Sequence, residues 1–409
     1  MAEASSLAII IIGAGPSGLF AADFLASMRH KVVVFEAMTS VGRKFLMAGR
    51  GGLNLTHSEG LEAFKTSYGA ASTWTSPWLD QFTPSDLQTW ANSLDQALFT
   101  GSSGRIFPKA LKASPLLRAW LRRLETLEVK IITGARWIGF SPAGEVHIRD
   151  KDGTVTGHAS RATLLALGGA SWPKLGSDGD WTNILAPLGV EITPLQASNC
   201  GIQLGWSTYI SGQFGGAILK NVAVSCGQTK ARGDVVMTQT GLEGGPIYAL
   251  SGSLRGALAA GPCSIEIDLR PDQTLEALAA KLVKAKAGQS LSTALKSHLR
   301  MTSPAIALMR EATHNKLPNS AMGLARLIKC LPLNVTGLAG LERAISTAGG
   351  VARASVDQHL MLKRLPGVFV AGEMIDWDAP TGGYLLQACF SSAALAAKGI
   401  DDWIAKSAS

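Results

Sequence analysis

Three glycines near the start of the chain, Gly13, Gly15 and Gly18, follow the spacing Gly-x-Gly-x-x-Gly. The first glycine of such a segment permits a tight turn, and the second lets a pyrophosphate approach backbone N–H groups at the positive end of a helix. The third lets that helix pack closely on a sheet. Glu36 follows 23 residues after Gly13, where a carboxylate accepts hydrogen bonds from ribose hydroxyls and disfavours a 2′-phosphate. The segment predicts dinucleotide binding by these four residues and Ala14.

A second glycine-rich stretch, residues 41–56, contains the cations Arg43, Lys44 and Arg50. Such a loop can wrap a pyrophosphate and then continue under an isoalloxazine ring, where side chains must be small. Arg43 and Lys44 are therefore further predicted cofactor ligands.

A third segment lies near the C-terminus, where the apolar run Gly367–Ala371 leads into Glu373. An acid at a strand end can hold ribityl hydroxyls, and a helix that starts near Gly383 can aim its positive end at the flavin N1–C2=O edge. A nicotinamide cofactor needs no such third segment, so the residues predict FAD as the bound cofactor. No second Gly-x-Gly-x-x-Gly occurs, and NAD(P)H is therefore predicted to be a transient electron donor.

Four polar residues flank the predicted flavin ring and are candidates for polarising a carbonyl group or delivering a proton: Arg50, Asn54, Asp376 and Tyr384. The alternative role of Asp376 is capping or loop hydrogen bonding. His57 directly follows the flavin loop, and the seven histidines together show no metal-ligand spacing. The five cysteines contain no Cys-x-x-Cys pair, so the sequence predicts no metal site.

The elements that must position these residues indicate an α/β fold. Leu7–Ile12 and Lys31–Glu36 are apolar runs, and Leu19–Met28 between them has the apolar spacing of a helix. This βαβ unit predicts a buried parallel sheet. Two further buried strands and a last helix are expected at Ala162–Leu167, Val368–Ala371 and Phe390–Ile404.

The middle of the chain has a different pattern. From about Leu195, short β-like runs alternate with glycines, which predicts a small antiparallel domain. Leu275–Ile328 then has helical spacing. We therefore predict a discontinuous Rossmann-like FAD-binding domain, residues 1–195 and 340–409. It is interrupted by an antiparallel β domain, 196–270, and a basic helical domain, 271–339.

The composition suits a folded protein, because 46% of the 409 residues are apolar and 17% are charged. The net charge of +8 is concentrated in two basic segments, 105–123 and 271–330. These segments either bind a polyanion such as ribosomal RNA or are solvated helix faces. No apolar run approaches the roughly 20 residues of a membrane span, and no signal-peptide pattern occurs. The sequence predicts a cytoplasmic protein without a membrane partner.

Several motifs resemble those of a known family. They are Gly51–Thr56, Ser103–Pro108, Leu165–Lys174, Gly233–Pro246, and Ala348–Gly350 together with Ala371–Phe390. In these motifs the chain is similar to the HI0933-like (BaiN/YhiN-like) flavoproteins. The resemblance implies an FAD-binding fold of the two-dinucleotide-binding-domain type, interrupted by a β-barrel-like and helical insert. The FAD-contacting positions that it implies are Gly13, Gly15, Gly18, Glu36, Lys44, Asn54, Gly168, Glu373 and Gly383, with the backbone of Trp137 in addition.

The resemblance also implies flavin-dependent reduction, with activities that include saturation of the C=C bond of enones and of a uridine in ribosomal RNA. We therefore interpret the chain as an FAD-dependent oxidoreductase that uses NAD(P)H to reduce an activated C=C bond by hydride transfer from flavin N5. The alternatives are a ribosomal RNA dihydrouridine synthase and a non-catalytic, flavin-stabilised RNA-binding protein. Leu53 replaces a cysteine common in the family, so chemistry that depends on that thiol is absent.

Overall fold

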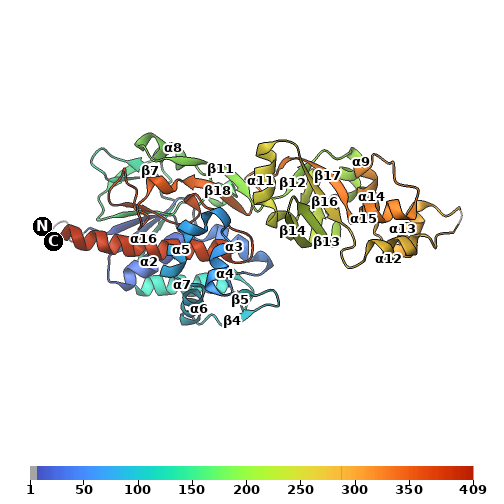
Figure 1. Cartoon of the computed structure of the whole chain (residues 1–409). Helices are drawn as coiled ribbons and strands as arrows, with labels where there is room; N and C mark the ends of the chain where they lie inside the picture. Colours follow the sequence, from blue (N-terminus) through green and yellow to red (C-terminus); the bar gives the residue numbers. More distant parts are fainter. Residues whose placement is uncertain (1–6, 287, 409) are drawn as a thin grey trace. The chain divides into compact units, whose positions relative to one another are not determined.

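The structure is a computed structural model that describes residues 7–286 and 288–408 and, within them, every side chain except those of Arg50 and Ala408. The chain divides into two compact units, which we describe one at a time. The first unit comprises residues up to Gln196 together with those from Ser346 onward, and the inserted unit comprises Ala197–Ile345 (Figure 1).

The first unit is built on a parallel sheet. Its strands are β1 (Ile9–Ile12), β2 (Val32–Glu36), β6 (Lys130–Thr133), β10 (Thr163–Leu165) and β19 (Val368–Val370). Their spatial order is β19-β10-β1-β2-β6, and every neighbouring pair is parallel. All four isoleucines of β1 are buried, as expected of a strand covered on both faces. The predicted α/β fold is confirmed.

Helices cover this sheet, and the longest is α16 (Tyr384–Ala408), which lies against α2 (Pro16–Ser27) and α5 (Ser72–Gln81) (Figure 1). Buried alanines of α16, such as Ala393 and Ala397, permit this close approach. The sequence predicts a helix that starts near Gly383 and a last helix at Phe390–Ile404, and both belong to α16. The other helices of the unit are α3 (Arg43–Ala48), α4 (Leu61–Thr66), α6 (Pro84–Ser93), α7 (Ala113–Thr126) and α8 (Thr182–Leu185).

Three small sheets complete the first unit. One contains β3 (Thr56–His57), β5 (Arg105–Pro108) and β4 (Leu98–Thr100), and it sets His57 opposite Arg105. A meander contains β7 (Arg136–Phe140), β8 (Val146–Arg149) and β9 (Val155–His158), and the third sheet pairs β11 (Ile192–Ser198) with β18 (Ser346–Val351). The last pair brings together the chain segments that leave and re-enter the first unit.

The inserted unit contains a closed antiparallel barrel. Its strands are β12 (Ile202–Leu204), β13 (Ile218–Cys226), β14 (Thr229–Met237), β15 (Gly241–Glu243), β16 (Cys263–Asp268) and β17 (Leu331–Leu338). The sequence assigns residues 331–338 to a helical domain, and this prediction is wrong. Alternate residues of β17 are buried in the order expected for a strand, with Leu331, Leu333 and Val335 facing inward.

The helices of the inserted unit are α9 (Thr208–Phe214), α10 (Gly245–Ala249), α11 (Ser251–Ala260), α12 (Leu275–Leu282), α13 (Leu291–Leu299), α14 (Ser303–Ala312) and α15 (Ala321–Lys329). Pro304 stands in the first turn of α14, where a proline is tolerated, and does not interrupt a helix. Leu278 and Leu308 share one hydrophobic core with Val224 and Ile265 of the barrel. The sequence separates these helices from the β domain at residue 270, whereas the two pack as one body.

Candidate active site

A pocket of about 470 Å³ opens where β1, β2 and β10 end and α2 begins. Carboxyl ends of parallel strands are the usual ligand site of such sheets. Nine predicted cofactor positions line the pocket: Gly13, Ala14, Gly15, Glu36, Arg43, Lys44, Trp137, Gly168 and Glu373. Gly18, Asn54 and Gly383 do not line it.

The glycine turn has the conformation that its spacing predicts. Gly13 has φ +100°, and a Cβ there would lie 2.4 Å from the carbonyl oxygen of Ala166. A Cβ on Gly18 would lie 1.9 Å from the carbonyl oxygen of Gly13, so Gly18 serves helix–strand packing. Gly15 is the N-cap of α2, which has no side-chain cap. The first N–H groups of α2 are therefore left for an anion.

The Glu36 carboxylate lies beside this turn. Its Oε2 accepts a hydrogen bond from the backbone N–H of Ala14 at 2.8 Å, and its Oε1 accepts one from that of Met38 at 2.8 Å. A carboxylate has about four acceptor positions, so two ribose hydroxyls can still donate to it. The arrangement fits an adenosine ribose without any rearrangement of the loop.

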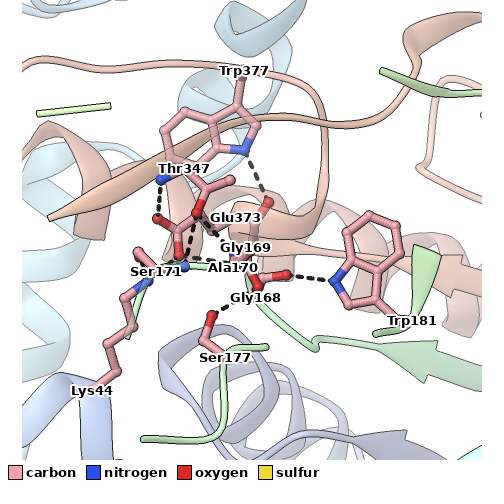
Figure 2. Close-up of polar contacts among 11 residues, drawn as sticks. Lys44, Gly168, Gly169, Ala170, Ser171, Ser177, Trp181, Thr347, Glu373 and Trp377 are labelled. Atoms are coloured by element: carbon pink, nitrogen blue, oxygen red, sulfur yellow. Dashed lines mark hydrogen bonds and ion pairs between the residues drawn. The ribbon is translucent and has the colours of Figure 1, made fainter. Parts of the chain in front are cut away.

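A buried polar network forms another part of the pocket wall (Figure 2). Lys44 Nζ lies 2.5 Å from Glu373 Oε2 and donates to Ser171 Oγ at 2.5 Å. Glu373 Oε1 accepts from the backbone N–H of Thr347 at 3.0 Å, and Thr347 Oγ1 accepts from the N–H groups of Ala170 and Ser171. Because Glu373 is 7% exposed, the cation and the N–H donor are what make its charge tolerable there.

Indole and hydroxyl donors fix the loop that carries this network. Trp181 Nε1 donates to the carbonyl of Gly168 and Ser177 Oγ to that of Gly169, both at 2.9 Å (Figure 2). Trp377 Nε1 donates to the carbonyl of Gly372 at 2.9 Å. The loop is therefore held in one shape next to the pocket, which is a requirement for precise ligand binding.

Some pocket groups still lack partners. Among the described residues, Arg43 Nε and Trp137 Nε1 are buried nitrogens without a hydrogen-bond acceptor. Both residues line the pocket. Buried donors normally have an acceptor, so these two nitrogens can bind acceptors of a ligand in the pocket. Burial raises the pKa of the Cys389 thiol to about 12, so this pocket residue stays uncharged.

A second polar cluster surrounds the first turn of α16. Gly383 has φ +103°, and a Cβ there would lie 2.6 Å from Cα of Thr56. The Tyr384 hydroxyl donates to Glu59 Oε1 at 2.5 Å, and its ring stacks on that of His57 at 5.7 Å. Burial, together with the hydrogen bond to Glu59, raises the pKa of Tyr384 to about 12. The phenol is therefore neutral at physiological pH.

The remaining predicted catalytic residues have different surroundings. Asp376 Oδ2 accepts a hydrogen bond from Thr193 Oγ1 at 2.7 Å, and its carbonyl accepts from Trp74 Nε1. These contacts match the structural role left open for Asp376. Asn54 is half-buried, and its Oδ1 has no partner among the described residues. Arg50 lies in the 3-10 turn Gly49–Gly51, and its side chain is outside the described part of the chain.

Sequence reasoning missed several residues of both clusters. Three residues that hold the first network lie inside or near motifs of the family resemblance: Thr347, Ser171 and Trp181. Their local spacing does not indicate a contact with Glu373 or Gly168. The sequence places Arg105 in a basic segment and in the motif Ser103–Pro108 without a role at the site, yet its Nε lies 3.7 Å from where a Cβ on Gly382 would stand. It is also close enough to Tyr384 to lower the pKa of the phenol, against the larger effect of burial.

Comparison with known proteins assigns this architecture to a family. The family model of the HI0933-like protein Rossmann domain matches residues 7–399. The chain belongs to the HI0933-like family. The resemblance drawn from the motifs is thus confirmed, and with it a Rossmann-like FAD-binding domain in a family of flavoprotein oxidoreductases.

This HI0933-like protein has named relatives of similar length. It is 26% identical to the 3-dehydro-bile acid delta(4,6)-reductase of Clostridium scindens, over 95% of this chain and 97% of that protein. It is 24% identical to the ribosomal RNA dihydrouridine synthase of Escherichia coli, over 94% of this chain and 95% of that protein. Among solved structures, the open conformation of a flavocytochrome c3 fumarate reductase is similar in fold, with a TM-score of 0.55 and 14% identity, over 98% of this chain and 80% of that one.

No helix among the described residues is both long and apolar enough to cross a membrane. Within the same residues, no group of three or more His, Cys, Asp or Glu side chains is placed to hold a metal ion.

Proposed function

We propose that the protein binds FAD in the pocket at the end of the parallel sheet. Uncapped N–H groups of α2 and the Arg43 and Lys44 cations would hold the pyrophosphate, Glu36 the adenosine ribose, and Glu373 the ribityl hydroxyls. The flavin ring then lies by the segment 49–55 and the first turn of α16, next to Asn54 and Gly383. Unpaired donors at Arg43 and Trp137 support this assignment.

We further propose that the protein reduces an activated C=C bond with electrons from NAD(P)H. Reduced FAD supplies a hydride to the electrophilic carbon. A carbonyl conjugated to the double bond would be polarised by Arg50, Asn54 or Arg105. The other carbon of the double bond, next to the carbonyl, would take a proton from Tyr384. One observation carries this proposal, which is a buried tyrosine hydroxyl at the first turn of α16 that is hydrogen-bonded to Glu59 and lies near the Arg105 cation. The relationship to a bile acid reductase points to an enone as the substrate.

A reduction assay tests this function. The purified protein should be yellow and release FAD, and NADH or NADPH should bleach the flavin under anaerobic conditions. With 4-androstene-3,17-dione as an enone probe, mass spectrometry should detect a product heavier by two hydrogens. Glu191→Gln, at an exposed acid outside the pocket, is the control variant. A protein that cannot retain added FAD contradicts the whole proposal, and a flavin that NAD(P)H does not reduce contradicts the proposed donor.

A ribosomal RNA uridine is the second candidate substrate, supported by the dihydrouridine synthase relatives and by exposed cations on α7. Arg118 and Arg122 are exposed, whereas Arg123 pairs with Asp23. The double variant Arg118→Ala/Arg122→Ala should therefore flatten the salt dependence of RNA binding without loss of flavin. Mass spectrometry of ribosomal RNA from a deletion strain shows whether a dihydrouridine disappears. RNA binding without any reduction would favour the non-catalytic RNA-binding alternative.

A further inference from the structure

Three titratable side chains follow one another in the second polar cluster. The Tyr384 hydroxyl donates to Glu59 Oε1 at 2.5 Å, and the same oxygen lies 3.8 Å from His57 Nδ1. Tyr384 is 9% exposed, whereas the side chains of Glu59 and His57 are 28% and 18% exposed. The row therefore leads from a nearly buried phenol to groups that water reaches.

The surroundings of His57 fix the orientation of its ring. Nε2 lies 2.9 Å from the carbonyl oxygen of Ser103, which only accepts, so Nε2 carries the proton in the neutral ring. Nδ1 accepts a hydrogen bond from the backbone N–H of Glu59 at 3.3 Å and faces its carboxylate. Gly104 has φ +78°, and a Cβ there would lie 2.5 Å from His57 Cε1. The absence of that side chain makes room for the imidazole against Tyr384.

We propose that His57 and Glu59 form a proton relay that returns a proton to Tyr384 after each reduction. This inference rests on the proposed function, in which Tyr384 is the proton donor at the first turn of α16. Tyr384 is the catalytic residue, and Glu59 and His57 act through it. Further titratable groups at the cluster are Arg105, near Gly382, the Tyr68 hydroxyl, which donates to the carbonyl of Tyr384, and Cys389, which acts electrostatically on Tyr68.

The double bond gains a hydride at one carbon and a proton from Tyr384 at the other, so the substrate is reduced by two electrons and the reduced cofactor is oxidised to FAD. A proton then moves from Nδ1 of the His57 imidazolium to the Glu59 carboxylate, and the carboxyl proton of Glu59 passes to the Tyr384 phenolate. His57 then regains its proton from water. A relay is needed because Tyr384 is only 9% exposed, so little water can reach the phenolate to return its proton.

The first test follows continuous turnover of the FAD-loaded protein, because the relay acts between one reduction and the next. Excess dithionite keeps the flavin reduced under anaerobic conditions, and the rate at which 4-androstene-3,17-dione is consumed is measured between about pH 5 and 8, the range in which imidazoles change charge. Tyr384→Phe should lower the rate by about 10²–10⁴-fold, as expected for loss of a proton donor. The wild-type rate should fall as the pH rises, and this fall should be absent in His57→Gln and Glu59→Gln. Tyr68→Phe, which removes a hydroxyl bonded only to the main chain, should keep the wild-type pH profile.

A second test needs no substrate. The chain has four tyrosines, so replacement by 3-fluorotyrosine gives four ¹⁹F signals, and the signal missing from Tyr384→Phe identifies Tyr384. That signal should shift between about pH 5 and 8, and the shift should vanish in His57→Gln. A Tyr384 signal that does not respond to pH in the wild type overturns the relay.

The two tests separate the relay from the proposed function. If the wild type does not consume the enone, enone reduction is overturned, and the ¹⁹F titration alone decides whether the three groups are coupled. If the wild type consumes the enone but His57→Gln and Glu59→Gln keep its rate and pH profile, the relay is overturned and the reductase proposal stands.

Discussion

At the level of a single residue, Glu36 has a structural role in the glycine turn besides the ligand-binding role that we propose for it. Its two oxygens hold the N–H groups of Ala14 and Met38 and thereby fix the glycine turn, while free lone pairs face the pocket. The side chain therefore shapes the site before any ligand arrives. A substitution here affects both the loop and the ligand, so its test needs a control with a similar structural role.

Glu36→Ala should weaken FAD binding by about one to two decades, because charge-assisted hydrogen bonds worth about 1.5–3 kcal/mol are lost. Asp150→Ala is the matched control, since Asp150 also accepts two backbone N–H bonds, from Asp152 and Thr154, but lies outside the pocket. Isothermal titration of FAD into the flavin-free variants measures the difference. Equal affinities of the two variants would contradict the ribose role of Glu36.

Gly15→Ala separates binding from stability. No atom lies within 4 Å of a Cβ built on Gly15, and its φ of −82° suits alanine, so the FAD-free protein should change in stability by no more than about 1 kcal/mol. FAD affinity should nevertheless fall at least about tenfold, because the methyl group occupies the approach of the pyrophosphate. Gly245→Ala, before Pro246 of α10 and also in open space, should affect neither. A large loss of stability in Gly15→Ala would contradict this explanation.

The glycine turn was predictable from the sequence because its contacts join residues close together in the chain. The Thr347 network was not, since its hydroxyl accepts hydrogen bonds from residues 176 and 177 positions away, and no spacing rule spans such a distance. Tyr384 was predicted at the site from the residues next to it in the chain. Its hydrogen-bond partner Glu59 lies 325 positions away and was therefore not predicted.

At the level of elements, α7 illustrates the limits of counting charges. Arg118, Arg122 and Arg123 look equivalent in the sequence, but the helix turns Arg123 toward Asp23, which is 2% exposed. Arg123 Nε donates to Asp23 Oδ1 at 2.8 Å, and Trp90 Nε1 donates to Oδ2 at 3.0 Å. One of the three cations therefore stabilises the fold and is not available to a phosphate.

Arg123→Ala should lower the free energy of unfolding by about 1–3 kcal/mol, because Asp23 would keep a buried charge with one fewer partner. Arg122→Ala, at an exposed position on the same helix, should change it by no more than about 0.5 kcal/mol. Urea denaturation followed by tryptophan fluorescence gives both values. If the two variants were equally stable, the Arg123–Asp23 contact would contribute nothing to the fold.

Elements with a continuous apolar pattern were predicted well, and those defined by tertiary context were not. The four isoleucines of β1 admit one interpretation, a strand buried on both faces. β17 contains Pro332 and follows four helices, so its membership of the barrel depends on pairing with β12 and β16.

At the level of the whole molecule, the two units have separate hydrophobic cores. β11 and β18 are hydrogen-bonded neighbours, so the chain leaves and re-enters the first unit at points about 5 Å apart. Every residue assigned to FAD binding belongs to the first unit. The cofactor site and the inserted unit should therefore be separable by deletion.

Replacement of residues 199–345 by a short Gly-Ser linker should leave a folded, yellow protein that binds FAD. The inserted unit expressed alone, residues 197–345, should fold and remain colourless. Visible spectra and thermal melting curves of both proteins check this. A shortened chain that aggregates, or that folds without FAD, would show that the first unit depends on the insert.

The position of Thr347 and Glu373 after the insert has a consequence for synthesis on the ribosome. Gly13 and Glu36 emerge early, but the groups that complete the pocket follow the whole inserted unit. At about 5–20 residues per second, translation separates Glu36 from Glu373 by about 15–70 s. Near the end of that interval, β10 is an edge strand without β19, while the inserted unit already has the residues for its own core. The cofactor pocket is therefore completed only near the end of synthesis. A nascent chain that stops short of residue 373 is released without a complete cofactor site.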